Sequence, residues 1–165
     1  GRLVLLDDVA ANAESWFVTR AFRLLRAEKP GVISVVAYSD PVPRVSVTGE
    51  TVLPGHVGTV YRALSARFRG RSSRRTDLLL PSGQAFSPRA VSKLKSGDVG
   101  AAYAERQLLS EGAPSRDPGE EAAAWLARLT AEGFLRRSRH PGNLVFSFPL
   151  TKAAKIAANR LPEAA

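Results

Sequence analysis

The sequence predicts a mixed α/β fold in which helices flank a sheet. Two short apolar runs typical of buried strands occur at Leu3–Leu6 and Val32–Tyr38, and a segment with helical periodicity separates them. With 44% hydrophobic and 24% charged residues the chain is of the globular type. We expect its 165 residues to form a single domain with a real core.

The first part of this domain, residues 1–80, is predicted to be a strand-helix-strand-helix-strand core. Residues 14–28 carry apolar side chains at helical spacing, and Lys29–Gly31 stops that helix. We expect the strands before and after it to pair in parallel.

The second strand is predicted to end at Ser39–Pro43, where two prolines remove backbone donors. A loop is expected over residues 44–54. Residues 59–69 then place apolar side chains at helical spacing with arginines between them, which predicts a second helix with a basic face.

A helical insertion over residues 87–133 is predicted to follow a hairpin at residues 76–86. Its first helix begins with Pro88 after the N-cap Ser87. The second covers residues 101–110, and a capping box at 117–120 starts the third. The C-terminal strand region, residues 134–150, contains these segments in order: a basic segment at 136–140, a turn at 141–143 and a strand at 144–150, before a short helix or tail at 152–160.

A net charge of +9 indicates a polyanionic partner, because most of the 24 basic residues are arginines, which contact phosphate in bidentate fashion. A GC-rich genome is the alternative source of arginine. Residues 44–75 hold seven arginines against the single acid Glu50, however, which favours a nucleic-acid-binding surface. The predicted phosphate-binding residues are Arg62, Arg67, Arg69, Arg71, Arg74, Arg75, Arg136, Arg137 and Arg139.

Missing residue types bound the chemistry further. The absence of cysteine excludes disulfides, zinc-thiolate sites and a thiol nucleophile, and it fits a cytoplasmic location. No apolar run approaches the ~20 residues of a membrane span, so no membrane partner is expected. The chain has no methionine, so we expect its parent protein to extend upstream and an N-terminal part of the fold to be missing. The sequence does not predict an oligomeric state.

The predicted order of strand, turn, helix, strand and helix resembles the core of the GCN5-related acetyltransferase (GNAT) fold. The turn pattern of that fold is Gln or Arg, two residues, Gly, one residue, then Gly or Ala, and Asp8, Ala11 and Ala13 stand at those positions here. This resemblance implies acetyl-CoA or a related acyl-CoA as cofactor. Its pyrophosphate would lie against Ala11, Asn12, Ala13, Glu14 and Ser15.

Four further segments make the resemblance more specific. They are, in order, Asn12–Ser15, Tyr38–Pro41, Gly55–Ala63 and His140–Asn143. Over roughly residues 2–150 this order resembles the Mom family of phage DNA-modification proteins, a divergent branch of the GNAT fold. The resemblance implies conversion of adenine in DNA to an N6-methylcarbamoyl derivative in the host cytoplasm, which protects phage DNA from restriction. The chain departs from the family in lacking upstream strands and in having Arg62 where Gln is expected.

The adenine amino group is a poor nucleophile, because its lone pair is delocalised into the ring. The site therefore needs an acceptor for the N–H and a donor for the leaving group or oxyanion. We expect Asp40 to accept the proton, and Tyr61 resembles the acetyltransferase tyrosine that protonates a departing thiolate. Ser39 is a candidate to hydrogen-bond the base or acyl group, and His56 to act as a base or ligand.

These candidates have structural alternatives. By spacing alone Tyr61 is an amphipathic packing residue, and a loop histidine such as His56 often caps a carbonyl. The target amine is out of reach inside a duplex, so the base must be extruded or single-stranded. Tyr38, Phe68 and Trp125 are candidate stacking groups, with core packing as the alternative.

Three other functions are open. A non-catalytic DNA-binding module would use the helices of residues 87–110 with residues 136–143 as a wing. An ordinary GNAT N-acetyltransferase would act on a protein or small amine. An iron enzyme would use His56, His140 and Asp40 as a two-histidine, one-carboxylate site.

Overall fold

The mixed α/β class is confirmed by a computed structural model that describes residues 9, 10 and 12–160. These residues belong to two compact units. The first unit takes the chain up to Pro41, residues 56–73 and the chain from Gly142 onward, and the second takes residues 42–55 and 74–141. Within the described part of the chain, no helix is both long and apolar enough to cross a membrane.

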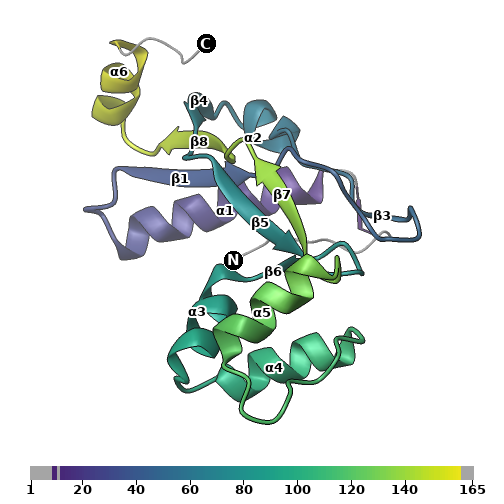
Figure 1. The fold of residues 1–165 in the computed structure, drawn as a ribbon. Helices are drawn as coiled ribbons and strands as arrows, with labels where there is room; N and C mark the ends of the chain where they lie inside the picture. Colours follow the sequence, from purple (N-terminus) through teal and green to yellow (C-terminus); the bar gives the residue numbers. More distant parts are fainter. Residues whose placement is uncertain (1–8, 11, 161–165) are drawn as a thin grey trace. The chain divides into compact units, whose positions relative to one another are not determined.

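The described residues form six helices and eight strands (Figure 1). The helices are α1 (Ala13–Glu28), α2 (Thr59–Ala63), α3 (Pro88–Ser96), α4 (Ala101–Ser110), α5 (Ala122–Ala131) and α6 (Lys152–Arg160). The strands are β1 (Ser34–Ser39), β2 (Arg44–Val45), β3 (Thr51–Leu53), β4 (Arg67–Arg71), β5 (Arg75–Leu79), β6 (Ala85–Phe86), β7 (Arg136–His140) and β8 (Leu144–Pro149).

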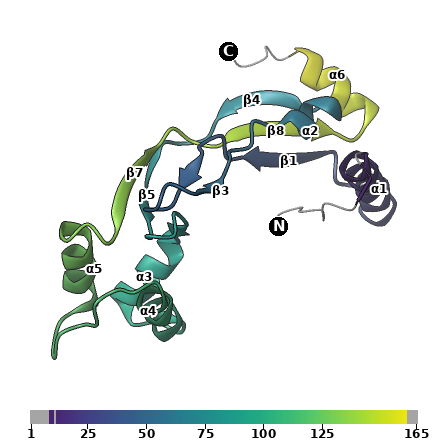
Figure 2. The same cartoon turned by 90° about the vertical axis from the view of Figure 1, so that its right-hand side faces the viewer.

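The first unit is built on an antiparallel sheet in the order β1-β8-β4, whose strands lie side by side in Figure 2. Phe146 and Phe148 are two residues apart on β8 and so point to the same face. Phe22 of α1 packs edge-on against Phe148, with ring centroids 5.0 Å apart. Tyr61 of α2 packs against both phenylalanines, at 5.4 and 5.7 Å. Helices α1 and α2 therefore cover the same face of this sheet.

The predicted helix at residues 14–28 is confirmed as α1, and the second strand ends at Ser39 as predicted. The predicted first strand, Leu3–Leu6, lies outside the described residues, and so does the parallel pairing expected for it. Where the structure describes the chain, β1 pairs with β8 in the antiparallel sense.

The predicted helix over residues 59–69 is wrong. Helix α2 ends at Ala63, Ser65 follows with a left-handed φ of 60°, and residues 67–71 form strand β4. Phe68 of this strand lies opposite Phe146 of β8, a partner far away in sequence. This long-range pairing overrides the helical spacing that the local sequence shows.

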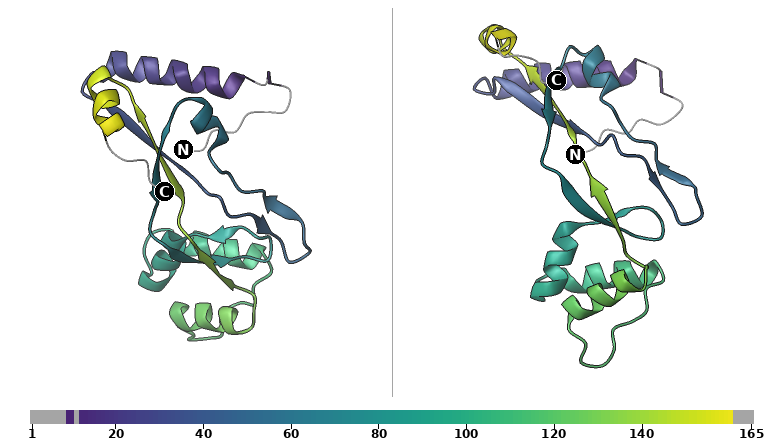
Figure 3. Two further views of the ribbon diagram at one scale, coloured as in Figure 1. Left: turned by 90° about the horizontal axis from the view of Figure 1, so that it is seen from above. Right: turned by 45° about the horizontal axis from the view of Figure 1, so that its top comes forward.

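The second unit joins the sheet β6-β5-β7, the hairpin β2-β3 and three helices. The hairpin predicted at 76–86 and the helices at 87–97 and 101–110 are confirmed. One expectation is corrected, because the loop predicted at 44–54 contains β2 and β3. The basic segment at 136–140, within the predicted C-terminal strand region, forms strand β7, which runs beside β5 in Figure 3. The core is a cluster of fully buried side chains from this unit. Its largest members are Trp125, Phe86, Leu80, Leu108, Leu129 and Leu135.

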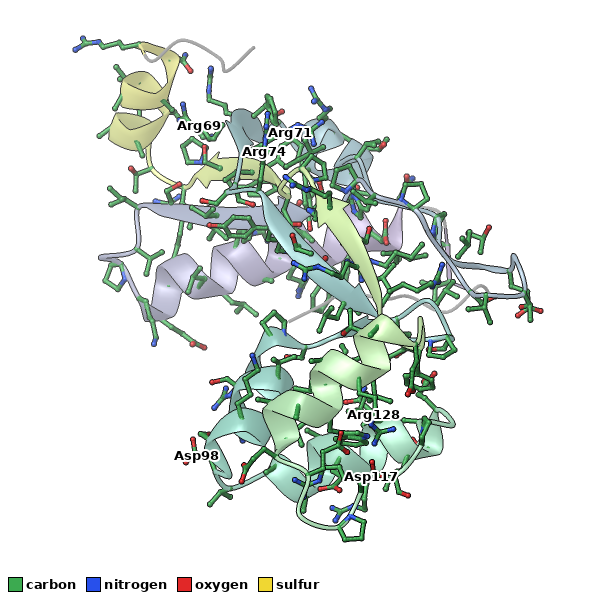
Figure 4. The ribbon with its side chains drawn as sticks, viewed as in Figure 1. Arg69, Arg71, Arg74, Asp98, Asp117 and Arg128 are labelled. Atoms are coloured by element: carbon green, nitrogen blue, oxygen red, sulfur yellow. The ribbon has the colours of Figure 1, made fainter. Side chains whose placement is uncertain are left out.

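The connection from α4 to α5 is held by Arg128, whose Nε and Nη2 donate to the two carboxylate oxygens of Glu120 at 2.9 and 2.7 Å. Nη2 also donates to the carbonyl oxygen of Ser115 at 3.0 Å. Figure 4 labels Arg128 and Asp117 at this connection. The N–H of Asp117 donates to Glu120, as a capping box requires, but α5 begins only at Ala122, so this box closes a turn before the helix and not the helix itself.

This clamp predicts acid sensitivity of the second unit. The hydrogen bonds from Arg128 lower the pKa of Glu120 from 4.5 to about 2. A lowered folded-state pKa gives stability that is present above pH 4.5 and is lost as pH falls towards 2. We expect Glu120→Gln to be less stable than the native chain at neutral pH, with the difference shrinking on acidification.

Urea unfolding followed by circular dichroism from pH 6 down to pH 2 measures this difference. Glu105→Gln is the control, because Arg116 donates to the two carboxylate oxygens of Glu105 over longer distances, 3.2 and 3.4 Å, and the Glu105 side chain is 29% exposed, against 12% for Glu120. An equal pH dependence for both variants would contradict the assignment to Glu120.

Candidate functional site

Four predicted site residues gather at the end of strand β1 in the first unit. The backbone N–H of His56 donates to the carbonyl oxygen of Asp40 at 2.6 Å. The hydroxyl of Tyr61 lies 3.5 Å from the carbonyl oxygen of Tyr38, a long hydrogen bond, and the Tyr61 ring stacks on His56 with centroids 5.2 Å apart. Ser39 and Asp40 follow Tyr38 directly. We call Ser39, Asp40, His56 and Tyr61 the β1-end cluster.

The contacts of His56 decide which of its nitrogens is available. Its Nδ1 accepts a hydrogen bond from the backbone N–H of Gly58 at 2.8 Å. A neutral imidazole that accepts at Nδ1 carries its proton on Nε2. His56 is thus arranged as a hydrogen-bond donor through Nε2, and the role of base expected for it would require the Gly58 contact to break.

The hydroxyl of Ser39 is the unusual group of this cluster. Ser39 is 3% exposed, and its Oγ has no hydrogen-bond partner among the described residues. Because Ser39 pairs with Leu144, its side chain shares the sheet face with Phe146 and helix α2. Leaving a buried polar group unpaired costs about 1–3 kcal/mol, so native proteins seldom keep one without a use for it.

Gly58 allows the chain to enter α2 beside the sheet. Its φ is +80°, and a Cβ at this position would lie 2.4 Å from Cζ of Phe146. Any side chain here therefore meets both backbone strain and a ring that is fully buried.

We expect Gly58→Ala to destabilise the first unit by about 2–4 kcal/mol, the sum of the left-handed backbone and overpacking penalties. Gly49→Ala is the matched control, since Gly49 has a φ of +85° with nothing within 4 Å of the added Cβ. Urea unfolding should show that the control variant loses about 1 kcal/mol of its free energy of unfolding. Equal losses in both variants would mean that the Phe146 contact contributes nothing.

The predicted cofactor residues lie at the start of α1, except Ala11, which is outside the described residues. Asn12 is the N-cap without a side-chain capping bond. In the first turn the N–H of Ala13 donates to the carbonyl oxygen of Ala10 at 2.9 Å, and the N–H groups of Glu14 and Ser15 have no acceptor within the helix. A hollow of about 350 Å³ lies beside this turn. Its walls include Asn12, Ser15, Trp16 and Arg20. Amide donors and a guanidinium group suit the binding of a phosphate, whereas the negative charge of the Glu14 carboxylate repels it.

Four of the predicted DNA-binding arginines belong to the first unit, and Figure 4 labels Arg69 and Arg71 of strand β4. None of the four has an ion pair with a described acid. Arg69 donates to the hydroxyl of Ser147 at 2.8 Å, and the guanidinium of Arg62 lies over the rings of Phe68 and Phe146 at 5.6 and 5.5 Å. The basic face predicted on a helix thus belongs largely to a strand.

The remaining five arginines lie in the second unit and differ in their partners. Arg74, Arg137 and Arg139 are exposed. Arg75 instead forms an ion pair with the buried Asp77 at 2.9 Å, and Arg136 donates to the carbonyl oxygen of Val45. These two contacts compete with the phosphate binding expected for Arg75 and Arg136.

Comparison with known protein families matches residues 1–117, more than half of the chain, to the Mom protein family. The chain belongs to the Mom family. This family is linked to phage DNA modification, and the matched region includes the β1-end cluster and the start of α1. No curated protein and no solved structure matches the chain.

The other predicted groups of this Mom-family chain are placed as follows. Trp125 is fully buried in the core, whereas Tyr38 is 56% exposed. His140 is 4% exposed on strand β7 of the second unit. The described residues contain no group of three or more His, Asp or Glu side chains arranged to hold a metal ion.

Sequence reasoning missed two sets of residues, one in each unit. Phe146 and Phe148 form the surface on which Tyr61 packs; their alternation in the sequence predicted a strand but not this contact. Asp77 is 6% exposed and binds Arg44 and Arg75, at 3.6 and 2.9 Å. The sequence signal that could have predicted these ion pairs is the single acid Asp77 close to several arginines.

Proposed function

We propose that this Mom-family chain is a GNAT-like transferase that modifies the N6 amino group of adenine in DNA. The observation that carries the proposal is the buried, unpartnered hydroxyl of Ser39 beside Asp40 at the end of β1. The order α1, β1, α2 agrees with the helix, strand and helix of the GNAT core. The family match supports DNA as the substrate.

The residues of the β1-end cluster divide the chemistry between them. Asp40 accepts a proton from the adenine amino group as its nitrogen becomes nucleophilic. Ser39 donates a hydrogen bond from its otherwise unpaired hydroxyl, either to the base or to the acyl oxygen. Tyr61 holds a proton on Oη that it gives to the departing group, and His56 donates from Nε2.

The start of α1 supplies the binding site for an acyl-CoA in this proposal. The N–H groups of Glu14 and Ser15, together with Arg20, would hold its phosphates. When bound, this cofactor supplies an acyl group activated as a thioester. Arg71 of β4 and the exposed arginines of the second unit bind DNA phosphates, and the base leaves its stack to reach the cluster.

Replacing Ser39 by alanine tests the proposal, because a purely structural residue and a ligand-binding one respond in opposite ways. Removal of a buried hydroxyl without a partner should raise or leave unchanged the free energy of unfolding. The same change should lower adenine modification by about tenfold or more if the hydroxyl meets the substrate. Mass analysis of nucleosides from DNA of expressing cells measures the second effect.

Ser110→Ala is the matched control, since Ser110 lies exposed on α4 and its hydroxyl donates to the carbonyl oxygen of Gln107. The control should leave modification unchanged. Unmodified DNA with tight, salt-dependent DNA binding by the native chain would overturn the proposal in favour of a binding module. Stabilisation by acetyl-CoA with no response to DNA would favour an ordinary acetyltransferase.

A further inference from the structure

A hollow of about 820 Å³ in the first unit is lined by none of the β1-end residues and shares Thr19 and Arg23 with the hollow at the start of α1. Its walls come from the second half of α1, the end of α2, strands β4 and β8, and α6. It adjoins the cluster through Phe148, whose ring packs against Phe22 on the hollow side and against Tyr61 on the other. We call it the α1-α6 groove.

The groove concentrates positive charge without neutralising it. Arg23, Arg26, Arg67 and Lys155 all line it. Arg67 donates to the neutral amide of Asn159, and none of the four has an ion pair with an acid in the described part of the chain. Like charges gathered in one hollow repel one another, so an anion that enters it is attracted by all four.

The floor of the groove is apolar. Phe148 is 5% exposed and Leu150 9%, and Phe22 and Leu64 complete the surface. A simple inorganic anion would use the cations and leave this floor in contact with water. A ligand that uses both has a flat or apolar body joined to anionic groups, which is the chemistry of a nucleoside phosphate.

We propose that the α1-α6 groove binds a phosphorylated nucleoside, with its base on the Phe22 and Phe148 floor and its phosphates on Arg23, Arg26, Arg67 and Lys155. Two sources have this chemistry: a nucleotide of the substrate strand beside the extruded adenine, and the nucleotide end of the acyl carrier. The inference deepens the proposed function and rests on it for these two sources.

Binding measurements on the full chain test the groove directly. The probes are a short fluorescein-labelled single-stranded oligodeoxynucleotide, followed by anisotropy, and coenzyme A, followed by calorimetry. We expect Arg23→Glu/Arg26→Glu to weaken at least one probe by about tenfold or more relative to Arg89→Glu/Lys95→Glu. The second pair makes the same charge change at exposed positions of α3 in the second unit.

A second matched pair covers the case in which the α1 variant does not fold. Lys155 and Lys152 are both exposed on α6, but only Lys155 lines the groove. Lys155→Glu should weaken binding more than Lys152→Glu. Loss for the oligonucleotide alone identifies the strand as the source, and loss for coenzyme A alone identifies the carrier.

Equal losses in the groove variants and their controls for both probes would overturn the proposal, because they would show attraction by net charge only. These binding measurements do not depend on enzyme activity. A chain that binds the probes as expected but leaves adenine unmodified would therefore contradict the proposed function without contradicting the proposal for the groove.

Discussion

Asp40→Asn should abolish adenine modification while the chain stays folded. The carboxylate of Asp40 is the group expected to accept the amino proton, and an amide cannot accept it as a base. The described hydrogen bond from the N–H of His56 to the backbone oxygen of Asp40 does not involve the side chain and is kept in this variant. We expect the modified fraction of adenine to fall by at least about 10²-fold, the usual contribution of a general base.

Mass analysis of digested DNA from cells expressing each variant gives the result, with circular dichroism confirming the fold. Asp98→Asn is the control, because Asp98 is an exposed carboxylate of the second unit, labelled in Figure 4, whose only described role is to accept from Ser96. It should modify DNA as the native chain does. Full modification by Asp40→Asn would remove Asp40 from the mechanism.

The sequence predicted helix and strand ends correctly where these depend only on neighbouring residues. Ser87 and Pro88 start α3 as an N-cap and a first-turn proline, and the Ser87 hydroxyl accepts from the N–H of Arg89 at 3.2 Å. The Asp-Pro step likewise ended β1 at Ser39. Such motifs act over a few residues, so all the residues that interact in them are neighbours in the sequence.

The sequence patterns predicted the wrong structure where a segment far away in the sequence determines the conformation. The segment at 67–71 alternates arginine with Phe68 and Gly70, a period-two pattern, but only its pairing with β8 makes it a strand. The β1-end cluster shows the same limit. The sequence order indicated Ser39, Asp40, His56 and Tyr61, but that Nδ1 of His56 accepts from Gly58 follows from the loop conformation. Proton positions of this kind depend on contacts that no residue pattern encodes.

The second large effect is expected in the core of the second unit. Leu129 is fully buried on α5 within the cluster around Trp125. Leu129→Ala removes buried methyl groups and leaves a cavity, which costs about 2–5 kcal/mol in well-packed cores. A domain is typically stable by only about 5–15 kcal/mol, so we expect this variant to unfold the second unit at much lower urea concentrations.

Trp125 reports on this unit alone when Trp16, the other tryptophan, is replaced by phenylalanine. Trp125 is 0% exposed and donates to the carbonyl oxygen of Pro114 at 2.9 Å, whereas Trp16 is 62% exposed. Leu109→Ala is the matched control, because Leu109 is 41% exposed on α4 and the chemical change is identical. The control should lower the free energy of unfolding, measured by Trp125 fluorescence in urea, by less than about 1 kcal/mol. Equal shifts would show that the cluster around Trp125 does not limit the stability of the second unit, since burial alone separates the two leucines.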